Sequence, residues 1–229
     1  MAIQWQKAKV VQHMRMGQIF SLLRFKSNEV FEFAAGQHIV VKIHEQRLAQ
    51  YSLMSTPGIQ PFELLIQYVS GGEATAYFMD LKVGDEIEYM GPLGNYAMQN
   101  DGAEQIVLMG TGSGVAPLLC MIRDMLRVGD NRSVWLYFGL RFEENVIMQE
   151  ELADLVKQFN DRLQVRTSLS QPSADWQGDR GYVTEWLKKD HGDLSQAGMY
   201  ICGGKELVIS AELVGTRLGC TRIYTELFW

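Results

Sequence analysis

Hydrophobic and polar positions follow one pattern in the first hundred residues and another in the rest of the chain. The early runs, such as residues 37–43 and 62–68, are short and rich in β-branched or aromatic side chains. Glycine and proline turn signals bound these runs, and only residues 73–81 suggest a helix. Many short strands with regular turns predict an antiparallel β-barrel or sandwich.

Strand-like and helical segments alternate after the polar stretch at residues 99–104. Strand patterns cover 106–109, 134–138, 163–168, 199–202 and 222–227, and helical patterns cover 116–128, 150–159, 183–189 and 206–218. This alternation predicts a Rossmann-like parallel sheet joined by right-handed crossovers. We therefore expect two domains, an antiparallel β-barrel in residues 1–100 and an α/β domain in residues 101–229.

Composition narrows the class of protein. The 229 residues are 47% hydrophobic, which can fill two cores, and the net charge of −6 comes without a basic tract, so nucleic acid is not an expected partner. Residues 1–11 contain no long apolar run, and no stretch approaches the roughly eighteen apolar residues of a membrane helix. We therefore expect no signal peptide, membrane anchor or membrane span, and a cytoplasmic location.

Cysteine and histidine spacing argues against a metal site. The three cysteines, Cys120, Cys202 and Cys220, are far apart and odd in number, which fits reduced thiols in a cytoplasm better than a disulfide framework. Three thiols also fall short of the usual four-thiolate iron–sulfur site. The four histidines are scattered without helical ligand spacing, so no metal is expected.

The strongest local motif is Gly110-Thr-Gly-Ser-Gly-Val-Ala-Pro117, which follows a strand pattern and opens a helical one. Its glycines allow a tight turn, amides at a helix start can face a phosphate, and proline suits the first helical turn. The glycine spacing departs from the usual dinucleotide fingerprint, and the next strand ends at Arg141 without the acidic residue that binds ribose. Alone, the motif fits either a nucleotide loop or a tight strand-to-helix turn.

Two segments of the first half allow both a functional and an ordinary structural interpretation. In Gly71-Gly-Glu-Ala-Thr75, the Thr75 hydroxyl could hold a phosphate at a helix start, or the segment could be a plain capped helix. Tyr51-Ser52 could set a ring and a hydrogen-bond donor against a flat ligand, or form a half-buried strand.

Two segments of the second half are equally open. Tyr200-Ile-Cys-Gly-Gly204 could line a ligand crevice at a strand end, or bury a core cysteine before a turn. The last two residues, Phe228 and Trp229, are aromatic and need something to pack on, either protein or a flat cofactor.

Taken together and in order, these motifs resemble the ferredoxin–NAD(P) reductase superfamily across nearly the whole chain. The matching segments are Phe33-Ala-Ala-Gly-Gln37, Tyr51-Ser52, Gly72 to Thr75, Gly91-Pro-Leu-Gly-Asn-Tyr96, Gly110 to Pro117, Gly139-Leu-Arg141, Tyr200 to Gly204 and Glu226-Leu-Phe228. The resemblance implies a flavin-binding antiparallel barrel followed by a nicotinamide-binding parallel sheet. It also implies hydride transfer between nicotinamide C4 and flavin N5, with FAD and NADH as cofactors and NADPH as a possible substitute.

The resemblance assigns roles residue by residue. Ser52, Cys202 and Glu226 are the expected catalytic residues, near flavin N5 and the nicotinamide. The expected cofactor-binding residues are Tyr51, Ser52, Gly72, Thr75, Gly110, Thr111, Gly112, Gly114, Pro117, Arg141, Cys202, Gly203, Phe228 and Trp229. The implied electron acceptor is a redox partner such as a ferredoxin or an oxygenase component.

One departure from the family pattern bears on flavin affinity. The family has an arginine that grips the flavin phosphate two positions before the Tyr-Ser pair, and here that position is Ala49, with Arg47 nearby. Either Arg47 substitutes through a local bulge, or the phosphate is held less tightly. Reduction of free flavin as a diffusing substrate, or a flavin-bearing subunit of a larger complex, therefore remain alternatives to an FAD-containing reductase.

NADH is the expected coenzyme. Phosphate-selective members of the family commonly place a Ser-Arg pair after the third strand of the sheet, and the arginine position here is Gln171. A neutral amide can bond ribose hydroxyls but cannot neutralise a phosphate. Arg166 and Arg180 lie nearby in the sequence and leave NADPH open.

Overall fold

The chain divides into two compact units in the computed structural model, which describes residues 4–28 and 32–228. The first unit takes the residues up to 98 together with 119–124, and the second takes 99–118 with the residues from 125 onward. Residues 119–124 therefore group with the first unit although the residues on both sides of them belong to the second, and no signal in the sequence marks this.

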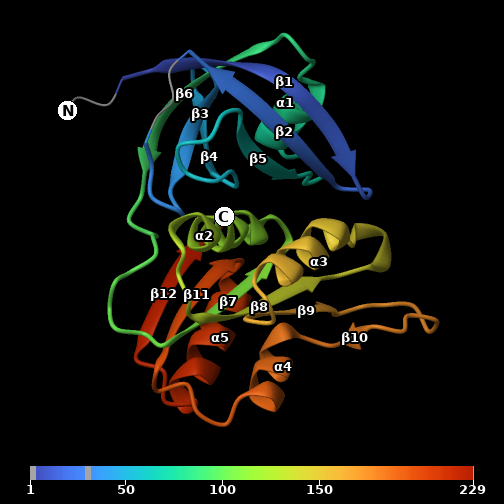
Figure 1. Ribbon diagram of the computed structural model, residues 1–229. Coiled ribbons are helices and arrows are strands. Elements are labelled where there is room, and N and C mark those ends of the chain that lie inside the picture. Colours follow the sequence, from blue (N-terminus) through green and yellow to red (C-terminus); the bar gives the residue numbers. More distant parts are fainter. Residues whose placement is uncertain (1–3, 29–31, 229) are drawn as a thin grey trace. The chain divides into compact units, whose positions relative to one another are not determined.

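The first unit is built on a six-stranded antiparallel sheet in the order β4-β3-β6-β1-β2-β5 (Figure 1). The strands are β1 (Gln6–Met16), β2 (Phe20–Ser27), β3 (His38–His44), β4 (Arg47–Ser52), β5 (Phe62–Gln67) and β6 (Glu86–Leu93). Just beyond β4, the Met54 amide donates to the Glu63 carbonyl of β5 at 3.0 Å. The two ends of the sheet therefore meet, and the sheet closes in the manner of a barrel.

An aromatic core fills this barrel. Phe25 stacks on Phe62 at 5.3 Å between ring centroids, and Phe62 lies 5.4 Å from Tyr89. Phe78, from the helix α1 (Glu73–Asp80), meets Phe25 edge-on at 6.4 Å. All four side chains are fully buried, so α1 is held against the strands by its one buried residue.

The second unit is a parallel sheet in the order β10-β9-β8-β7-β11-β12. The strands are β7 (Gln105–Thr111), β8 (Ser133–Leu140), β9 (Leu163–Leu169), β10 (Asp179–Arg180), β11 (Ala197–Gly203) and β12 (Arg222–Leu227). The chain runs outward from β7 through β8 and β9, then returns to β11 on the other side of β7. Such a reversal leaves a crevice at the carboxyl ends of the strands, where ligands bind in open α/β sheets.

Helices cover both faces of this sheet, with α2 and α3 on one side and α4 and α5 on the other (Figure 1). Their bounds are α2 (Val115–Val128), α3 (Gln149–Gln158), α4 (Val183–Asp190) and α5 (Lys205–Arg217), with short 3₁₀ turns η1 (Gly112–Gly114) and η2 (Glu143–Asn145). The apolar faces of α4 and α5 pack on β7, β8 and β11 in one buried cluster. The expected strands and helices of the second half are all confirmed, and the two-residue β10 is an addition.

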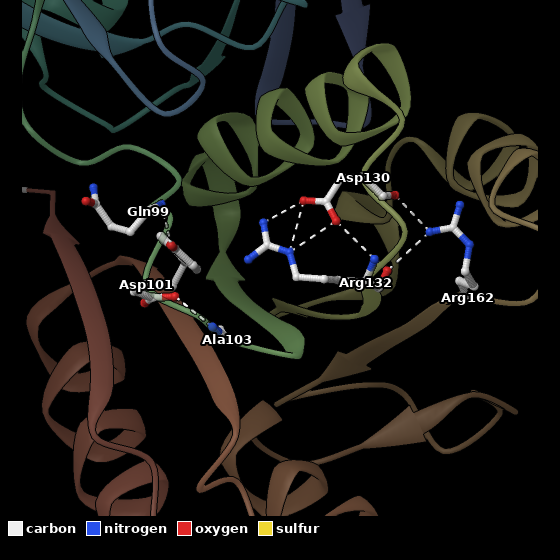
Figure 2. A network of polar contacts seen from close by, with 7 residues as sticks. Gln99, Asp101, Ala103, Asp130, Arg132 and Arg162 are labelled. Atoms are coloured by element: carbon white, nitrogen blue, oxygen red, sulfur yellow. Dashed lines mark hydrogen bonds and ion pairs between the residues drawn. The ribbon is translucent and has the colours of Figure 1, made fainter.

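Polar contacts fasten the loops at the amino ends of β7, β8 and β9 (Figure 2). Asp130 binds the Arg132 guanidinium through both carboxylate oxygens, at distances from 2.6 to 3.1 Å. Arg162 donates to the carbonyls of Asp130 and Arg132 at 3.0 and 3.3 Å. This network lies at the edge of the sheet opposite the carboxyl ends, so its role is structural.

Candidate functional site

The glycine loop joins β7 to α2 and lies directly against β11. Gly112 has a left-handed φ of 56° in η1, a conformation that glycine adopts without strain. A Cβ placed on Gly114 would overlap the Cys202 carbonyl oxygen, and one on Gly110 would lie 2.8 Å from Leu118 Cδ1. These two glycines are therefore needed for close packing of loop, helix and strand, whatever the loop binds.

Strand ends from three strands meet around Thr111. A Cβ on Gly139 of β8 would lie 2.9 Å from Thr111 Cγ2, and one on Gly203 of β11 would lie 2.6 Å from Thr111 Oγ1. No side chain caps the amino end of α2, but the Val115 amide already donates to the Gly112 carbonyl, so an anion here would be bound by other backbone amides of the glycine loop. Pro117 lies in the first turn of α2, where its missing amide costs nothing.

Cys202 and Glu226 are neighbours on adjacent strands at this same edge. Cys202 pairs with Gly110 of β7 on one side and with Glu226 of β12 on the other. The thiol is fully buried, and this burial, with the charge of Glu226 adding to it, holds the pKa of Cys202 well above its usual range. Burial also raises the pKa of the Glu226 carboxyl. A raised pKa favours the protonated thiol, which fits a residue that packs against or lines a pocket better than a thiolate nucleophile.

Phe228 continues the pairing of β12 with β11. The Phe228 amide donates to the Gly203 carbonyl at 3.0 Å, and its ring is half-buried. Trp229, the other expected aromatic contact, lies outside the described residues. The sequence-predicted residues Gly110, Thr111, Gly112, Gly114, Cys202, Gly203, Glu226 and Phe228 are thus brought together at the carboxyl edge of the parallel sheet.

Arg141 lies beyond the end of β8, on the loop that leads to η2. Its Nε donates to Gln171 Oε1 at 2.9 Å, which links the loop after β8 to the loop after β9. Arg166 and Arg180 take no part in this link between Arg141 and Gln171. Arg166 forms a bidentate pair with Asp190 at 2.7 and 2.8 Å, and Arg180 donates to backbone carbonyls of its own loop.

In the first unit, Tyr51 and Ser52 end β4 beside α1. The Tyr51 ring meets Phe78 edge-on at 4.5 Å, and burial raises the pKa of its phenol to about 12, with the charge of Arg47 acting in the opposite direction. Ser52 is a buried residue at the end of the strand. A serine hydroxyl at such a position can donate a hydrogen bond to a ligand.

Gly72 and Thr75 form the turn that opens α1. The Thr75 hydroxyl lies 3.0 Å from the Gly72 carbonyl and 3.3 Å from both the carbonyl and the amide of Val69, so the protein itself uses it to close the turn. The first backbone bond into the helix is from Ala76 to Gly72, which leaves the three preceding amides for an anion. The amides, more than the hydroxyl, are the phosphate-binding groups that this turn offers.

The structure adds contacts that sequence reasoning missed. The Gln37 side-chain oxygen accepts a hydrogen bond from the Ala34 amide at 2.8 Å, and its Nε2 donates to the Gly94 carbonyl at 3.0 Å. One side chain therefore joins the motif that ends at Gln37 to the motif that contains Gly94. His44 pairs with Glu73 of α1 at 2.9 Å. The sequence does not predict either contact, because Gln37 and Gly94 are 57 residues apart and His44 and Glu73 are 29 residues apart.

The described part of the chain contains no group of three or more potential metal ligands. None of its helices is both long and apolar enough to cross a membrane.

Comparisons with known proteins agree with this geometry. Residues 7–98 match the family model of the oxidoreductase FAD-binding domain, and residues 108–212 match that of the oxidoreductase NAD-binding domain. Ferredoxin–NADP reductase B of Sorangium cellulosum is 32% identical over 85% of this chain and 84% of its own length. The crystal structure of Amycolatopsis cytochrome P450 reductase GcoB superposes with a TM-score of 0.92 at 26% identity, over 99% of this chain and 70% of that one.

A reductase component of the naphthalene 1,2-dioxygenase/salicylate 5-hydroxylase systems of a Ralstonia species is 30% identical over 90% of this chain. The match covers 64% of that relative, so the present chain spans somewhat less than two thirds of its length. The expected barrel, the expected Rossmann-like sheet and the two expected cofactor-binding domains agree with these matches. The chain belongs to the ferredoxin–NAD(P) reductase superfamily, a family of NAD(P)H-dependent flavoprotein oxidoreductases.

Proposed function

We propose that this protein is an FAD-dependent NAD(P)H oxidoreductase that passes electrons from a nicotinamide to a redox partner such as a ferredoxin or an oxygenase component. The observation that carries the proposal is the convergence of the glycine loop, Cys202 and Glu226 at one edge of the parallel sheet. Bound FAD would supply the chemistry, accepting two electrons from the nicotinamide as a hydride and releasing them to the acceptor.

The first unit offers groups that fit a flavin. Tyr51 presents a half-buried ring, Ser52 presents a hydroxyl at the end of β4, and the turn at Gly72 presents amides ahead of α1. These groups would hold the ring by packing, donate a hydrogen bond at its edge and bind the pyrophosphate. The Thr75 hydroxyl would act indirectly by keeping that turn closed.

The second unit offers groups that fit a nicotinamide coenzyme. The amides at the start of α2 would bind the pyrophosphate, and the pocket wall of Cys202 and Gly203 would orient the nicotinamide. The half-buried carboxyl of Glu226 lies on the strand next to the thiol and would hold a proton or accept a hydrogen bond there. Positioning of the nicotinamide, and exclusion of water by the buried residues Cys202 and Gly203, would be the contribution of the protein to the reaction.

The acceptor is proposed from relatives. The Ralstonia relative is named as a reductase component of oxygenase systems, and so is a propane 2-monooxygenase component of Rhodococcus jostii that is 30% identical over 79% of this chain. An oxygenase system or a ferredoxin is therefore the class of acceptor that we propose. Free flavin as a diffusing substrate is the second candidate, and Ala49 is the observation that favours it.

Steady-state oxidation of NADH by the purified chain separates these candidates. An FAD-containing reductase is expected to be yellow as isolated and to reduce an artificial one-electron acceptor without added flavin. A free-flavin reductase would be colourless and would turn over only when flavin is added, with saturation in flavin concentration. A flavin-bearing subunit without turnover of its own would be yellow but inactive with both coenzymes.

A further inference from the structure

The loops that follow β8 and β9 are joined to each other at the carboxyl edge of the sheet. Leu140 and Leu169, the last residues of the two strands, are paired in register. Beyond them, Ser170 donates its amide to the Leu140 carbonyl at 3.0 Å, and Gln171 donates to the Arg141 carbonyl at 2.9 Å. The two loops therefore leave the sheet side by side, with a fixed backbone.

Glu143 extends this junction with its side chain. One carboxylate oxygen, Oε1, accepts the Ser173 amide at 3.0 Å and the Ser173 hydroxyl at 2.7 Å. No protein partner is recorded for its other oxygen, Oε2, among the residues that the structure describes. A carboxylate held in this way presents a fixed acceptor at the edge of the sheet.

This position is where the ribose of a dinucleotide would lie. In Rossmann-like sheets the pyrophosphate binds at the first strand-to-helix loop, and the adenosine ribose lies beyond the end of the next strand, where an acidic residue commonly accepts its hydroxyls. The second strand here is β8, which ends at Leu140 without an acidic residue. Glu143 follows three residues later, held in place by a contact from β9's loop that the sequence does not reveal.

Two features of the surroundings disfavour a second phosphate on that ribose: the donors of Ser173 are already used, and Arg166 is paired with carboxylates. The Ser173 amide and hydroxyl, donors of the kind that a phosphate needs, are already bound to Glu143. Arg141 opposes this tendency, because Gln171, the acceptor of its Nε, is a neutral amide that leaves the guanidinium charge in place. Arg166 is held by Asp190 and Asp179, the latter at 2.8 Å from its Nη1.

We propose that Glu143 is a specificity-determining residue that makes NADH the preferred coenzyme, by accepting the ribose hydroxyls of NADH and repelling the 2′-phosphate of NADPH. The phosphate carries up to two negative charges, and like charges at close range oppose binding. The inference rests on the proposed function, since it concerns which nicotinamide coenzyme the second unit takes.

Calorimetric binding of two adenosine fragments to the flavin-loaded protein tests the role of Glu143. Adenosine 5′-monophosphate represents the NADH end, and adenosine 2′,5′-bisphosphate represents the NADPH end. Glu143→Gln removes the charge and keeps the acceptor, so the bisphosphate is expected to bind about tenfold more tightly, and the monophosphate to change by less than about threefold. Glu144→Gln is the matched control, because this neighbouring glutamate is exposed and has no recorded contact with the β9 loop.

Each outcome of the fragment titration has a definite meaning. The assignment would be overturned if Glu143→Gln left the ratio of the bisphosphate and monophosphate affinities unchanged. It would also be overturned if Glu144→Gln changed that ratio by the same factor. Tight binding of the bisphosphate by the unaltered protein that is lost in Arg141→Gln would overturn it too, because Arg141 would then be a phosphate ligand. If the unaltered protein binds neither fragment and oxidises neither coenzyme, the proposed function fails as well, which distinguishes the two results.

Discussion

Gly114 lies against the backbone of Cys202 so closely that a single added carbon on Gly114 would overlap the Cys202 carbonyl oxygen. The glycine loop and the strand that carries the cysteine are therefore one packed unit. Gly114, the third glycine of the motif, allows α2 to pack closely on β11. The end of β11 carries the expected pocket residues Cys202 and Gly203.

A methyl group at this contact is expected to destabilise the second unit. Gly114→Ala should lower the free energy of unfolding by about 1–3 kcal/mol, because the loop or β11 must move to accommodate the new carbon. Gly204→Ala is the matched control, since that glycine has an ordinary φ of −68° and nothing within 4 Å of the added carbon. Urea unfolding measures both, and equal stability of the two variants would show that the contact is not tight.

Replacement of the pocket cysteine is expected to slow flavin reduction without loss of flavin. Cys202→Ala should change the alignment of the nicotinamide, and a misplacement of about 1 Å can cost on the order of a hundredfold in rate. Cys220→Ala is the control. Cys220 is also buried, but it lies before the amino end of β12, at the edge of the sheet opposite the carboxyl ends of the strands. If rapid-mixing experiments with NADH give the same rate for both variants, Cys202 is a packing residue only.

FAD affinity is expected to depend on two positions of β4. Residues two apart on a strand share a face, so Arg47 and Ala49 lie on the same side as Tyr51, and β3 is bulged opposite this point, between Lys42 and His44. Arg47→Ala should weaken FAD binding and Ala49→Arg should tighten it, because arginine pairs with phosphate through two hydrogen bonds. Lys26→Ala, on β2, controls for loss of a positive charge elsewhere on the first unit.

Flavin release from the purified proteins, followed by fluorescence, measures these affinities. Retention that rises with Ala49→Arg and is unaffected by Arg47→Ala would mean that Arg47 does not substitute for the missing arginine. Equal retention in all the variants would mean that the phosphate is bound by backbone amides alone.

The stability of the second unit is expected to depend on a tyrosine–aspartate contact as the pH falls. Burial acts to raise the pKa of Asp101, but the Tyr224 hydroxyl at 2.7 Å and the Ala103 amide at 3.0 Å outweigh it and hold that pKa below its ordinary value of 3.8. A depressed carboxyl pKa stabilises the fold above the unfolded pKa, and this stabilisation is lost as the pH falls through the folded value.

Tyr224→Phe should therefore lower the free energy of unfolding by about 0.5–1 kcal/mol near neutral pH, a modest amount because Asp101 is partly exposed. The difference should shrink below pH 3.8, and the pKa of Asp101 followed by NMR should rise in the variant. Tyr182→Phe, at a tyrosine whose side chain is exposed, is the control. A difference that does not change with pH would exclude the linkage to Asp101.

Periodicity and turn signals predicted both sheets, because strand alternation and helical spacing are local properties of the chain. The glycine loop and the Tyr-Ser pair could also be found, since close backbone packing and strand ends leave recognisable residues. The link between Glu143 and Ser173 could not be found, because it joins loops that are 30 residues apart and depends on strand order. The bond that occupies the Thr75 hydroxyl could not be found either, since any threonine at that position fits both a phosphate ligand and a turn-closing residue.

Anaerobic mixing of the purified protein with NADH tests the central claim most directly, with the absorbance of oxidised flavin as the signal. The account predicts that FAD copurifies and that its oxidised band bleaches rapidly on mixing, with one flavin reduced for each NADH consumed. A protein that is colourless and has no measurable affinity for FAD, or whose bound flavin is reduced by neither NADH nor NADPH, would contradict the account.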